Sequence, residues 1–424
     1  MYSDCNWVGV MKYENVMINY ENARKIMPGG NGLLSKRPSL KSANYPQYAR
    51  FAKGHQIWTD RINDIGTQVF QDFHLMGIGC CTLGYANTFV NNAVCDVIWS
   101  GNMTSLNCPE EYELAQRLLT LDKIQEMVRF SRLGCDAVSQ AVRVARAYTG
   151  KTKILYRGYH GWHDWYMAGA GNGQPNAGIP KCLTKKIAPY YLDADLSNIA
   201  AVVLEPALFD TNYLEMTRET CARWDVPLIY DEITSGFRMK LGSCTNITPD
   251  IEIYGKALGN GYPICAIVGQ EYVMKRYDDT FISSTFNTER TGFAAGKATL
   301  DYMIKHNVQD TLIQNGKIVK AYWEDCAHEF GFEIKITGLD PLATFVFIEK
   351  TDSTTREDNK LMTLYQQEMV KKGFLAGSQY YASIAHKYPY MCEFGASVYN
   401  TFNDMAEENV KLEGRVAQSG VKHG

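Results

Sequence analysis

Two charged residues stand directly after apolar runs of the kind that form buried strands. Lys256 follows residues 251–255 (Ile-Glu-Ile-Tyr-Gly), and a glycine-rich turn comes after it. A lysine at such a position is partly removed from water, which lowers the pKa of its amine and makes it a nucleophile suited to Schiff-base chemistry. Asp231 follows residues 227–230 (Pro-Leu-Ile-Tyr), and an acid there can keep the basic ring nitrogen of an aldehyde cofactor protonated. The alternative is a surface lysine that only closes a strand.

Three further segments carry groups that could act with this pair. Residues 132–136 (Arg-Leu-Gly-Cys-Asp) lead from a strand into a helix, so the N–H groups at Gly134 can hold an anion such as a phosphate. Residues 158–165 (Gly-Tyr-His-Gly-Trp-His-Asp-Trp) are rich in aromatics, and Tyr159 could stack on a planar ring. The alternative for this segment is an aromatic lid packed on the domain surface. Glu205 ends another strand and could pair with a substrate cation or an arginine.

The order of elements places these groups together. Apolar strand-like runs recur at 126–131, 153–156, 200–204, 228–230, 251–254 and 265–268, and helix-like segments separate several of them. Repeated β-α units of this kind predict a mostly parallel, doubly wound α/β sheet, in which ligands bind beyond the carboxyl ends of the strands. Strand alternation turns Glu232 to the side opposite Asp231. We therefore expect one crevice to contain Gly134, Tyr159, Glu205, Asp231 and Lys256.

The rest of the chain is predicted to form helices and a second, α+β region. Helices are expected at 15–25, 88–100, 110–121, 137–148, 291–305, 309–330, 360–372 and 405–418, a β-hairpin at 56–60 and 68–73, and antiparallel strands at 332–337 and 343–349. We expect residues 76–305 to form the large domain that carries the strand ends. Residues 306–424 would form a smaller α+β domain, to which residues 1–75 contribute.

Composition excludes several classes of function. Among the 424 residues, 46% are hydrophobic and 21% charged, and the net charge of -3 gives no electrostatic case for nucleic acid or an anionic membrane. No apolar run approaches the ~18 residues that span a bilayer, and the N-terminus lacks a secretory pattern. The twelve cysteines are scattered without C-x-x-C, which is typical of reduced residues in a cytoplasmic protein. The eight histidines show no H-E-x-x-H, so no metal site is predicted.

Several motifs give the chain a resemblance to a known family. They are Pro-Gly-Gly at 28–30, Tyr-His-Gly at 159–161, D-E-x-x-x-G-F-R at 231–238 and, about 17 residues later, G-K-x-x-G-x-G from 255. The chain resembles the class III aminotransferases, and most of all the glutamate-1-semialdehyde 2,1-aminomutase branch. The resemblance implies pyridoxal 5′-phosphate as cofactor and the type I (aspartate-aminotransferase) fold. In that fold a mostly parallel seven-stranded sheet has helices on both faces, and a smaller α+β domain lies beside it.

The resemblance also implies roles for individual residues. Lys256 would form the internal aldimine and later move a proton, Asp231 would hold the pyridinium nitrogen, and Tyr159 and Ile233 would cover the two ring faces. Thr285 matches a threonine that reaches the phosphate from a neighbouring subunit, which implies a homodimer with shared active sites. Lys256, Asp231 and Tyr159 are the implied catalytic residues. The implied cofactor-binding residues are Gly134, Cys135, Asp136, Tyr159, His160, Glu205, Asp231, Ile233, Lys256 and Thr285.

The sequence departs from the family pattern at three places. The phosphate loop S-G-T-E is replaced by Leu-Gly-Cys-Asp at 133–136, so both hydroxyls are missing. The usual G-N-P after Thr285 is replaced by Thr-Glu-Arg at 288–290. The aminomutase segment N-S-P-V-R, whose arginine binds the substrate carboxylate, corresponds to residues 31–37, which end in Arg37. These variants resemble a side branch from surface-polysaccharide and other specialised biosynthetic clusters.

Three functions follow as hypotheses. The first is an aminotransferase that uses an amino donor and a separate carbonyl acceptor. The second is an intramolecular aminomutase, and the third is an inactive cofactor-binding scaffold protein. The sequence does not identify the donor or the acceptor. Candidate substrate contacts are Arg37, Trp162, His163, Glu205, Tyr381 and His386.

Overall fold

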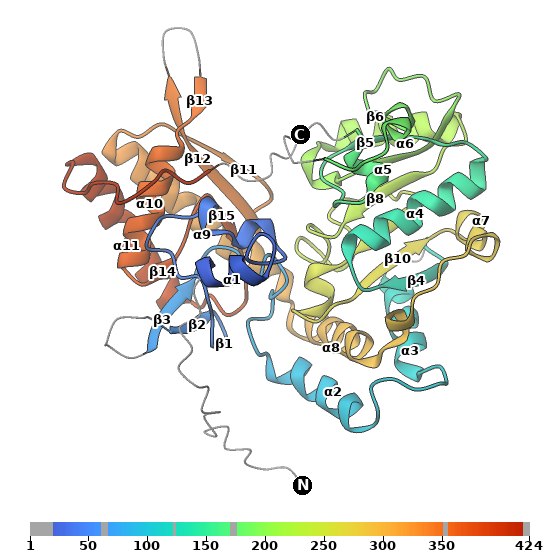
Figure 1. The fold of residues 1–424 in the computed structure, drawn as a ribbon, viewed down its shortest axis with the longest axis horizontal. Coiled ribbons are helices and arrows are strands. Elements are labelled where there is room, and N and C mark those ends of the chain that lie inside the picture. The colour runs from blue at the N-terminus through green and yellow to red at the C-terminus, as the bar shows by residue number, and fades with distance from the viewer. Residues whose placement is uncertain (1–19, 61–66, 122–123, 170–175, 351–354, 419–424) are drawn as a thin grey trace.

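The computed structural model describes residues 20–60, 67–121, 124–169, 176–350 and 355–418. Figure 1 shows two lobes, one built from the middle of the chain and one that combines early described segments (blue) with late ones (orange to red). The division into a domain at 76–305 and a smaller one at 306–424 with residues 1–75 stays a prediction.

The middle of the chain forms the mostly parallel seven-stranded sheet that the family resemblance implies. Its strand order is β4-β10-β9-β8-β7-β5-β6, and β10 alone among these strands runs antiparallel to its neighbours. The strands are β4 (Met127–Ser131), β5 (Lys153–Arg157), β6 (Ile187–Pro189), β7 (Ile199–Leu204), β8 (Leu228–Glu232), β9 (Ile251–Tyr254) and β10 (Cys265–Gly269). The sequence did not predict β6, because three residues that end in proline carry little strand signal.

Alternate residues of these strands pack against helices on opposite faces of the sheet, as strand geometry requires. Val203 packs with α4 (Gly134–Thr149), whereas its neighbour Val202 packs with Leu214 of α6 (Thr211–Arg223). Near β4 and β10, a third group of side chains comes from α2 (Thr88–Trp99), α3 (Pro109–Leu121) and α8 (Arg290–His306). Short helices α5 (Asp164–Met167) and α7 (Glu271–Met274) complete this lobe.

The other lobe joins segments that are far apart in the sequence. The hairpin of β2 (Gln56–Asp60) and β3 (Thr67–Asp72), with β1 (Phe51–Lys53), forms a sheet with β14 (Phe374–Leu375), which pairs with β3 in parallel. A second sheet contains β11 (Ile334–Thr337), β12 (Leu342–Lys350), β13 (Thr355–Glu357) and β15 (Gln379–Tyr381). The helices are α1 (Tyr20–Ile26), α9 (Val308–Phe330), α10 (Asn359–Lys371) and α11 (Tyr388–Ala406). Residues 15–19 of the predicted first helix and the turn 61–66 lie outside the described residues.

The predicted terminal helix at 405–418 is wrong. The helix is α11, which begins at Tyr388 and ends at Ala406, and the residues after it are irregular. Apolar side chains at helical spacing explain its position, because Met391, Phe394, Val398 and Phe402 are all buried. Residues 407–418 carry mostly polar side chains, which leaves that segment without an apolar face to pack.

Two expectations drawn from the whole sequence concern membrane-spanning helices and the state of the cysteines. None of the helices in the described ranges combines the length and the apolar character that crossing a bilayer requires. Every cysteine in the described part of the chain is free.

Candidate active site

The predicted groups lie at one edge of the large sheet. β4, β5, β7, β8 and β9 run in the same direction, so their carboxyl ends meet there. Direct contacts join the segments that follow these strands. The Tyr159 N–H donates to Glu205 Oε2 at 2.9 Å, and a Cβ added to Gly134 would lie 2.8 Å from Ile233 Cδ1.

Lys256 is the first residue of the short 3-10 helix Lys256–Gly259 that follows β9. Its φ of 30° is rare for a residue with a side chain, so the surrounding structure must hold it. Asn260 provides this restraint, because it accepts from the Leu83 N–H at 2.9 Å and donates to Gly84 O at 3.1 Å. The turn that carries the lysine is thereby fixed to the glycine-rich segment 76–85.

The lysine amine is positioned and made more nucleophilic by its surroundings. Nζ donates to Thr234 Oγ1 at 2.7 Å. Burial lowers the pKa of Lys256, and nearby Cys80, Glu205 and Asp231 oppose this effect. A lowered pKa increases the fraction of neutral amine, which is the nucleophilic form.

Asp231 is a buried acid with an oriented partner. Its Oδ2 lies 2.8 Å from Nδ1 of His160, and its Oδ1 accepts from the Ile233 N–H at 3.2 Å. The other ring nitrogen of His160 faces Arg157 O at 3.2 Å, so the imidazole is held at both nitrogens. These contacts fix the carboxylate at the end of β8. Glu232, on the opposite side of the strand, instead bonds Ser235 Oγ and Ser243 Oγ, each at 2.5 Å.

Glu205 is an acid that can change protonation near neutral pH. Burial raises its pKa to about 7, and the charge of Asp231 adds to this rise. Gly158 lies against it, because a Cβ at that glycine would approach Glu205 Oε2 to 2.6 Å. The carboxyl is therefore confined near Lys256 with a proton available for exchange.

The raised pKa predicts a pH-dependent stability of the cofactor-free protein. Because the folded-state pKa exceeds the ordinary value of 4.5, the stabilising contribution is fully present below that value and is lost as pH rises through about 7. Glu205→Gln does not titrate, so its free energy of unfolding relative to wild type should rise between pH 5 and pH 8, by about 3 kcal/mol at most. Urea unfolding at both pH values measures this change. Glu219→Gln, on the exposed side of α6, is the control; an equal change in that variant contradicts the assignment.

The N-terminus of α4 provides a place for an anion. The first helical hydrogen bond runs from the Ala137 N–H to Leu133 O, so the N–H groups of residues 134–136 precede the hydrogen bonds of the helix itself. Gly161 packs directly on this turn, because its Cβ would lie 2.6 Å from that of Cys135. His163 pairs with Asp136 at 3.1 Å.

These residues fit pyridoxal phosphate. The site offers a buried amine, an oriented carboxylate for the ring nitrogen, and the side chains of Tyr159 and Ile233 for the ring. An N-terminal helical turn is available for the phosphate. Gly134 and Gly255 both face Ile233, and a Cβ on either would approach that side chain to 2.8 and 3.3 Å.

The other predicted residues lie in different environments. Thr285 is exposed on the short helix Thr285–Thr288. Tyr381 lies beside Arg238, whose guanidinium is 5.9 Å from the centre of the tyrosine ring. Trp162 is exposed, and Arg37 is partly buried with its Nε lacking a hydrogen-bond partner in the described part of the chain.

His386 does not fit its predicted role as a substrate contact. The ring is 1% exposed, Nδ1 lies 2.8 Å from the Tyr380 hydroxyl and Nε2 lies 2.9 Å from Asp72 O. Burial lowers the pKa of His386 to about 3, so it is a neutral group of the core.

Sequence reasoning missed three residues at the site. Thr234 bonds the lysine amine, and Arg238 donates hydrogen bonds to Gly79 O and to Thr234 O. Cys80 lies close enough to Lys256 and Arg238 for their positive charges to act on its thiol. Thr234 and Arg238 stand in the D-E-x-x-x-G-F-R motif, but their contacts depend on how that turn folds back. The signal for Cys80 was the glycine-rich segment around it, where Met76 and Ile78 have positive φ.

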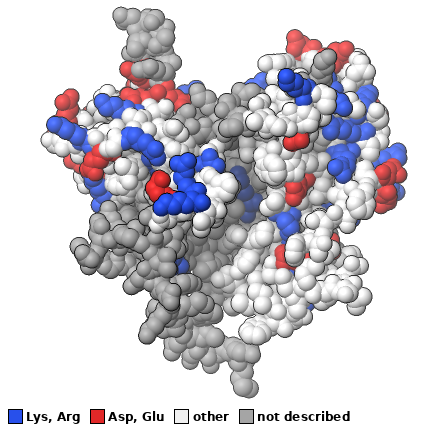
Figure 2. All heavy atoms as spheres, in the orientation of Figure 1, with Lys and Arg blue, Asp and Glu red and all other residues white. Residues whose placement is uncertain are grey.

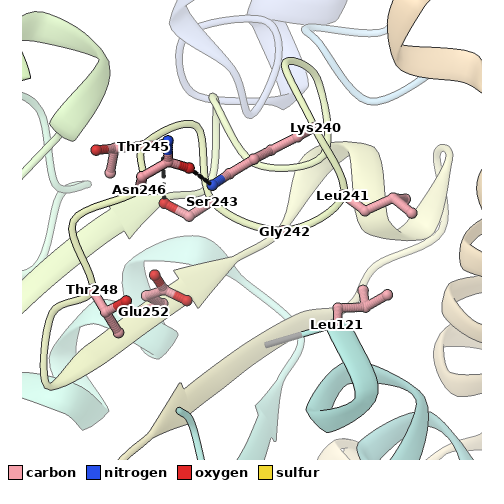
Figure 3. Close-up of a pocket in the computed structure, with 9 residues that line it drawn as sticks. All are labelled: Leu121, Lys240, Leu241, Gly242, Ser243, Thr245, Asn246, Thr248 and Glu252. Carbon is pink, nitrogen blue, oxygen red and sulfur yellow. Dashed lines mark hydrogen bonds between the residues drawn. The ribbon is translucent and has the colours of Figure 1, made fainter. Parts of the chain in front are cut away.

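A separate hollow lies beside the loop that follows Arg238. Its volume is about 200 Å³, and Figure 3 shows the residues that line it, which are Leu121, Lys240, Leu241, Gly242, Ser243, Thr245, Asn246, Thr248 and Glu252. None of the described residues around Lys256 lines it. The volume is below the ~300 Å³ at which small-molecule sites usually begin.

Comparisons with known proteins agree with this geometry. The model of the class-III aminotransferases matches residues 59–377. The 3-aminobutyryl-CoA aminotransferase of Cloacimonas acidaminovorans is 29% identical over 402 residues, which cover 89% of this chain and 94% of that protein. Glutamate-1-semialdehyde 2,1-aminomutase of Methanothrix thermoacetophila is 30% identical over 394 residues, covering 85% and 89%.

A solved structure of a pyridoxal phosphate-binding protein has the same fold. The PLP internal aldimine form of the FumI protein of Sphingopyxis sp. MTA144 matches with a TM-score of 0.81 at 25% identity, covering 93% of this chain and 97% of that one.

Proposed function

This chain belongs to the class-III aminotransferases and is a pyridoxal phosphate-dependent enzyme, and we propose that it transfers an amino group from an external donor to a separate carbonyl substrate. The observation that supports this most is the placement of Lys256. Its amine is largely buried, bonded to Thr234, and surrounded by acids that can exchange protons with it.

The residues of the chain have distinct tasks in this proposal. Bound pyridoxal phosphate supplies an aldehyde that condenses with amines and a ring that takes up the electrons of a broken Cα bond. Lys256 Nζ removes the proton at the substrate Cα, and Thr234 keeps that nitrogen oriented. Asp231, oriented by His160, would accept the hydrogen of the ring nitrogen. Tyr159 and Ile233 would hold the ring, and Glu205 would pair with the substrate ammonium.

The test separates a transferase from a mutase. Enzyme loaded with cofactor is mixed with single amino donors and no acceptor. A transferase releases about one carbonyl product per site and then stops, and a later acceptor restarts it. The relative named as an aminomutase supports the second candidate, an intramolecular exchange, for which product would accumulate without any donor or acceptor. If no compound reacts although the cofactor is bound, the protein is an inactive scaffold.

We place this reaction in specialised or surface-polysaccharide biosynthesis, on the strength of the sequence variants at 29–38, 158–166 and 283–290, and in the cytoplasm, on the strength of the scattered cysteines. The changed segment before Arg37 separates the chain from the aminomutase pattern.

A homodimer is the assembly that we propose. Large apolar side chains are exposed at the end of α2, on the segment after it and on the segment before α8, among them Trp99 (90% exposed), Leu106, Phe281 (88% exposed) and Phe286. Arg290 joins these segments, because its side chain donates to Ser100 O at 3.2 Å and to Gly101 O at 3.1 Å. Charged side chains are sparse over this part of the surface (Figure 2). Exposed apolar side chains gathered in this way are typical of an interface.

The same surface contains a hollow of about 530 Å³ beside the loop that carries Thr285. It is lined by residues of α3, β4 and that loop, including Tyr112, Phe130, Ser284 and Thr288. A second copy of the chain would cover this hollow and bring Thr285 to its neighbour's phosphate.

Charging this patch is expected to separate the subunits. Trp99→Asp combined with Phe281→Asp places two unpaired charges in the buried interface, so the mass measured by sedimentation should fall from a dimer to a monomer. Met216→Asp, at an exposed position on α6, is the control. A dimer that persists in the double variant would place the interface elsewhere.

A further inference from the structure

A cluster of polar side chains lies on and beside the proposed phosphate turn, and the reaction proposed above gives these side chains no task. It contains Cys135, Asp136 and His163, whose potential ligand atoms all lie within 4.8 Å of one another. His163 Nε2 is 3.1 Å from Asp136 Oδ1. The residues come from two elements, the first turn of α4 and the segment before α5.

The imidazole of His163 is held at both nitrogens. Because an ionised carboxylate only accepts hydrogen bonds, Nε2 carries the hydrogen that faces Asp136. Ser139 Oγ donates its one hydrogen to Cys135 O at 2.8 Å and accepts from the Trp165 indole N–H at 2.9 Å. Its contact with His163 Nδ1 at 2.7 Å is therefore one in which Nδ1 donates, so both ring nitrogens carry a hydrogen, as in the cationic form of histidine. The histidine is thus built into the turn.

This pair contributes little to folding. The side chains of His163 and Asp136 are 26% and 42% exposed, and ion pairs in such positions add little to stability. The pair instead affects the net charge of the turn that would bind the anion. The N–H groups of residues 134–136 favour an anion, but the Asp136 carboxylate in the same turn repels one.

We propose that His163 neutralises Asp136 and thereby allows this turn, which lacks the two hydroxyls of the family pattern, to bind the phosphate of the cofactor. The proposal rests on the position proposed above for the phosphate. His163 is a positioning residue here: it acts on the phosphate through Asp136.

The test compares two ligands that differ only in the phosphate. Cofactor-free wild type, His163→Gln, Asp136→Asn and the double variant are titrated with pyridoxal phosphate and with pyridoxal. His163→Gln should weaken binding of pyridoxal phosphate roughly tenfold and leave pyridoxal unchanged, because the uncompensated carboxylate repels only the phosphate. The double variant should recover the wild-type affinity, because it has no charge left to neutralise. His328→Gln, on the exposed side of α9, is the control.

Three results would overturn the proposal. Equal weakening for pyridoxal and pyridoxal phosphate would mean that His163 only supports the fold. A double variant as weak as His163→Gln would mean that the imidazole contacts the phosphate itself. Stoichiometric zinc in the purified protein, lost in Asp136→Asn, would assign the cluster to a metal. These binding results do not depend on which amine the enzyme transfers.

Discussion

Lys256→Ala is expected to lower the rate of amino transfer by at least ~10³-fold, because the variant loses both the amine that bonds the cofactor and the group that moves the Cα proton. Burial and the Thr234 bond prepare this nitrogen for both tasks. The variant should still bind pyridoxal phosphate, since the phosphate turn and Asp231 are unchanged, but without the visible absorbance band of the lysine-bound form. Steady-state rates and absorbance spectra measure the two effects.

Two further lysine variants sharpen this test. Lys256→Arg keeps the positive charge but not the nucleophile, so it should be as inactive as the alanine variant. Lys275→Ala removes an exposed lysine that pairs with Glu271 at 2.7 Å and should remain fully active. Activity in Lys256→Arg would show that only the charge is needed.

Asp231→Asn is expected to lower the rate by roughly 10²–10⁴-fold, an effect second only to that of the lysine. The amide has nearly the same shape and can still accept from the Ile233 N–H, but it lacks the charge that keeps the ring nitrogen protonated. Asp231→Asn should therefore lower the maximal rate and change the affinity for the cofactor much less.

The adjacent acid provides a matched control. Glu232 is equally buried, but it bonds Ser235 and Ser243 on the other side of the strand. Glu232→Gln should change the free energy of unfolding and leave the maximal rate close to that of wild type. A larger loss of rate in Glu232→Gln than in Asp231→Asn would show that the two acids are assigned the wrong way round.

The sheet was predictable because its strands are continuous apolar runs. Residues 199–204 are buried at every position, and such a run has few structures available other than a central strand. The direction of the strands then brought Asp231, Lys256 and Glu205 to one edge without any knowledge of their contacts. The terminal helix was misplaced because its buried apolar positions begin at Met391, directly after a first turn that contains Pro389.

The finer contacts of the site were not predictable, because they join segments through loop conformations. Thr234 reaches Lys256 only because the turn after β8 folds back toward the next strand. The Asp136–His163 pair depends on Gly161 lying against Cys135, which is a feature of packing. The homodimer, by contrast, was implied by Thr285 alone, and the exposed patch around Trp99 now supports it independently.

The central claim is that Lys256 is the residue that bonds pyridoxal phosphate. Reduction of the cofactor-loaded wild-type enzyme with borohydride, followed by proteolysis and mass spectrometry, tests it most directly. The account predicts one pyridoxyl group per chain, on the peptide that contains Lys256. A pyridoxyl group on another lysine, or none on any peptide although the cofactor is bound, would contradict it.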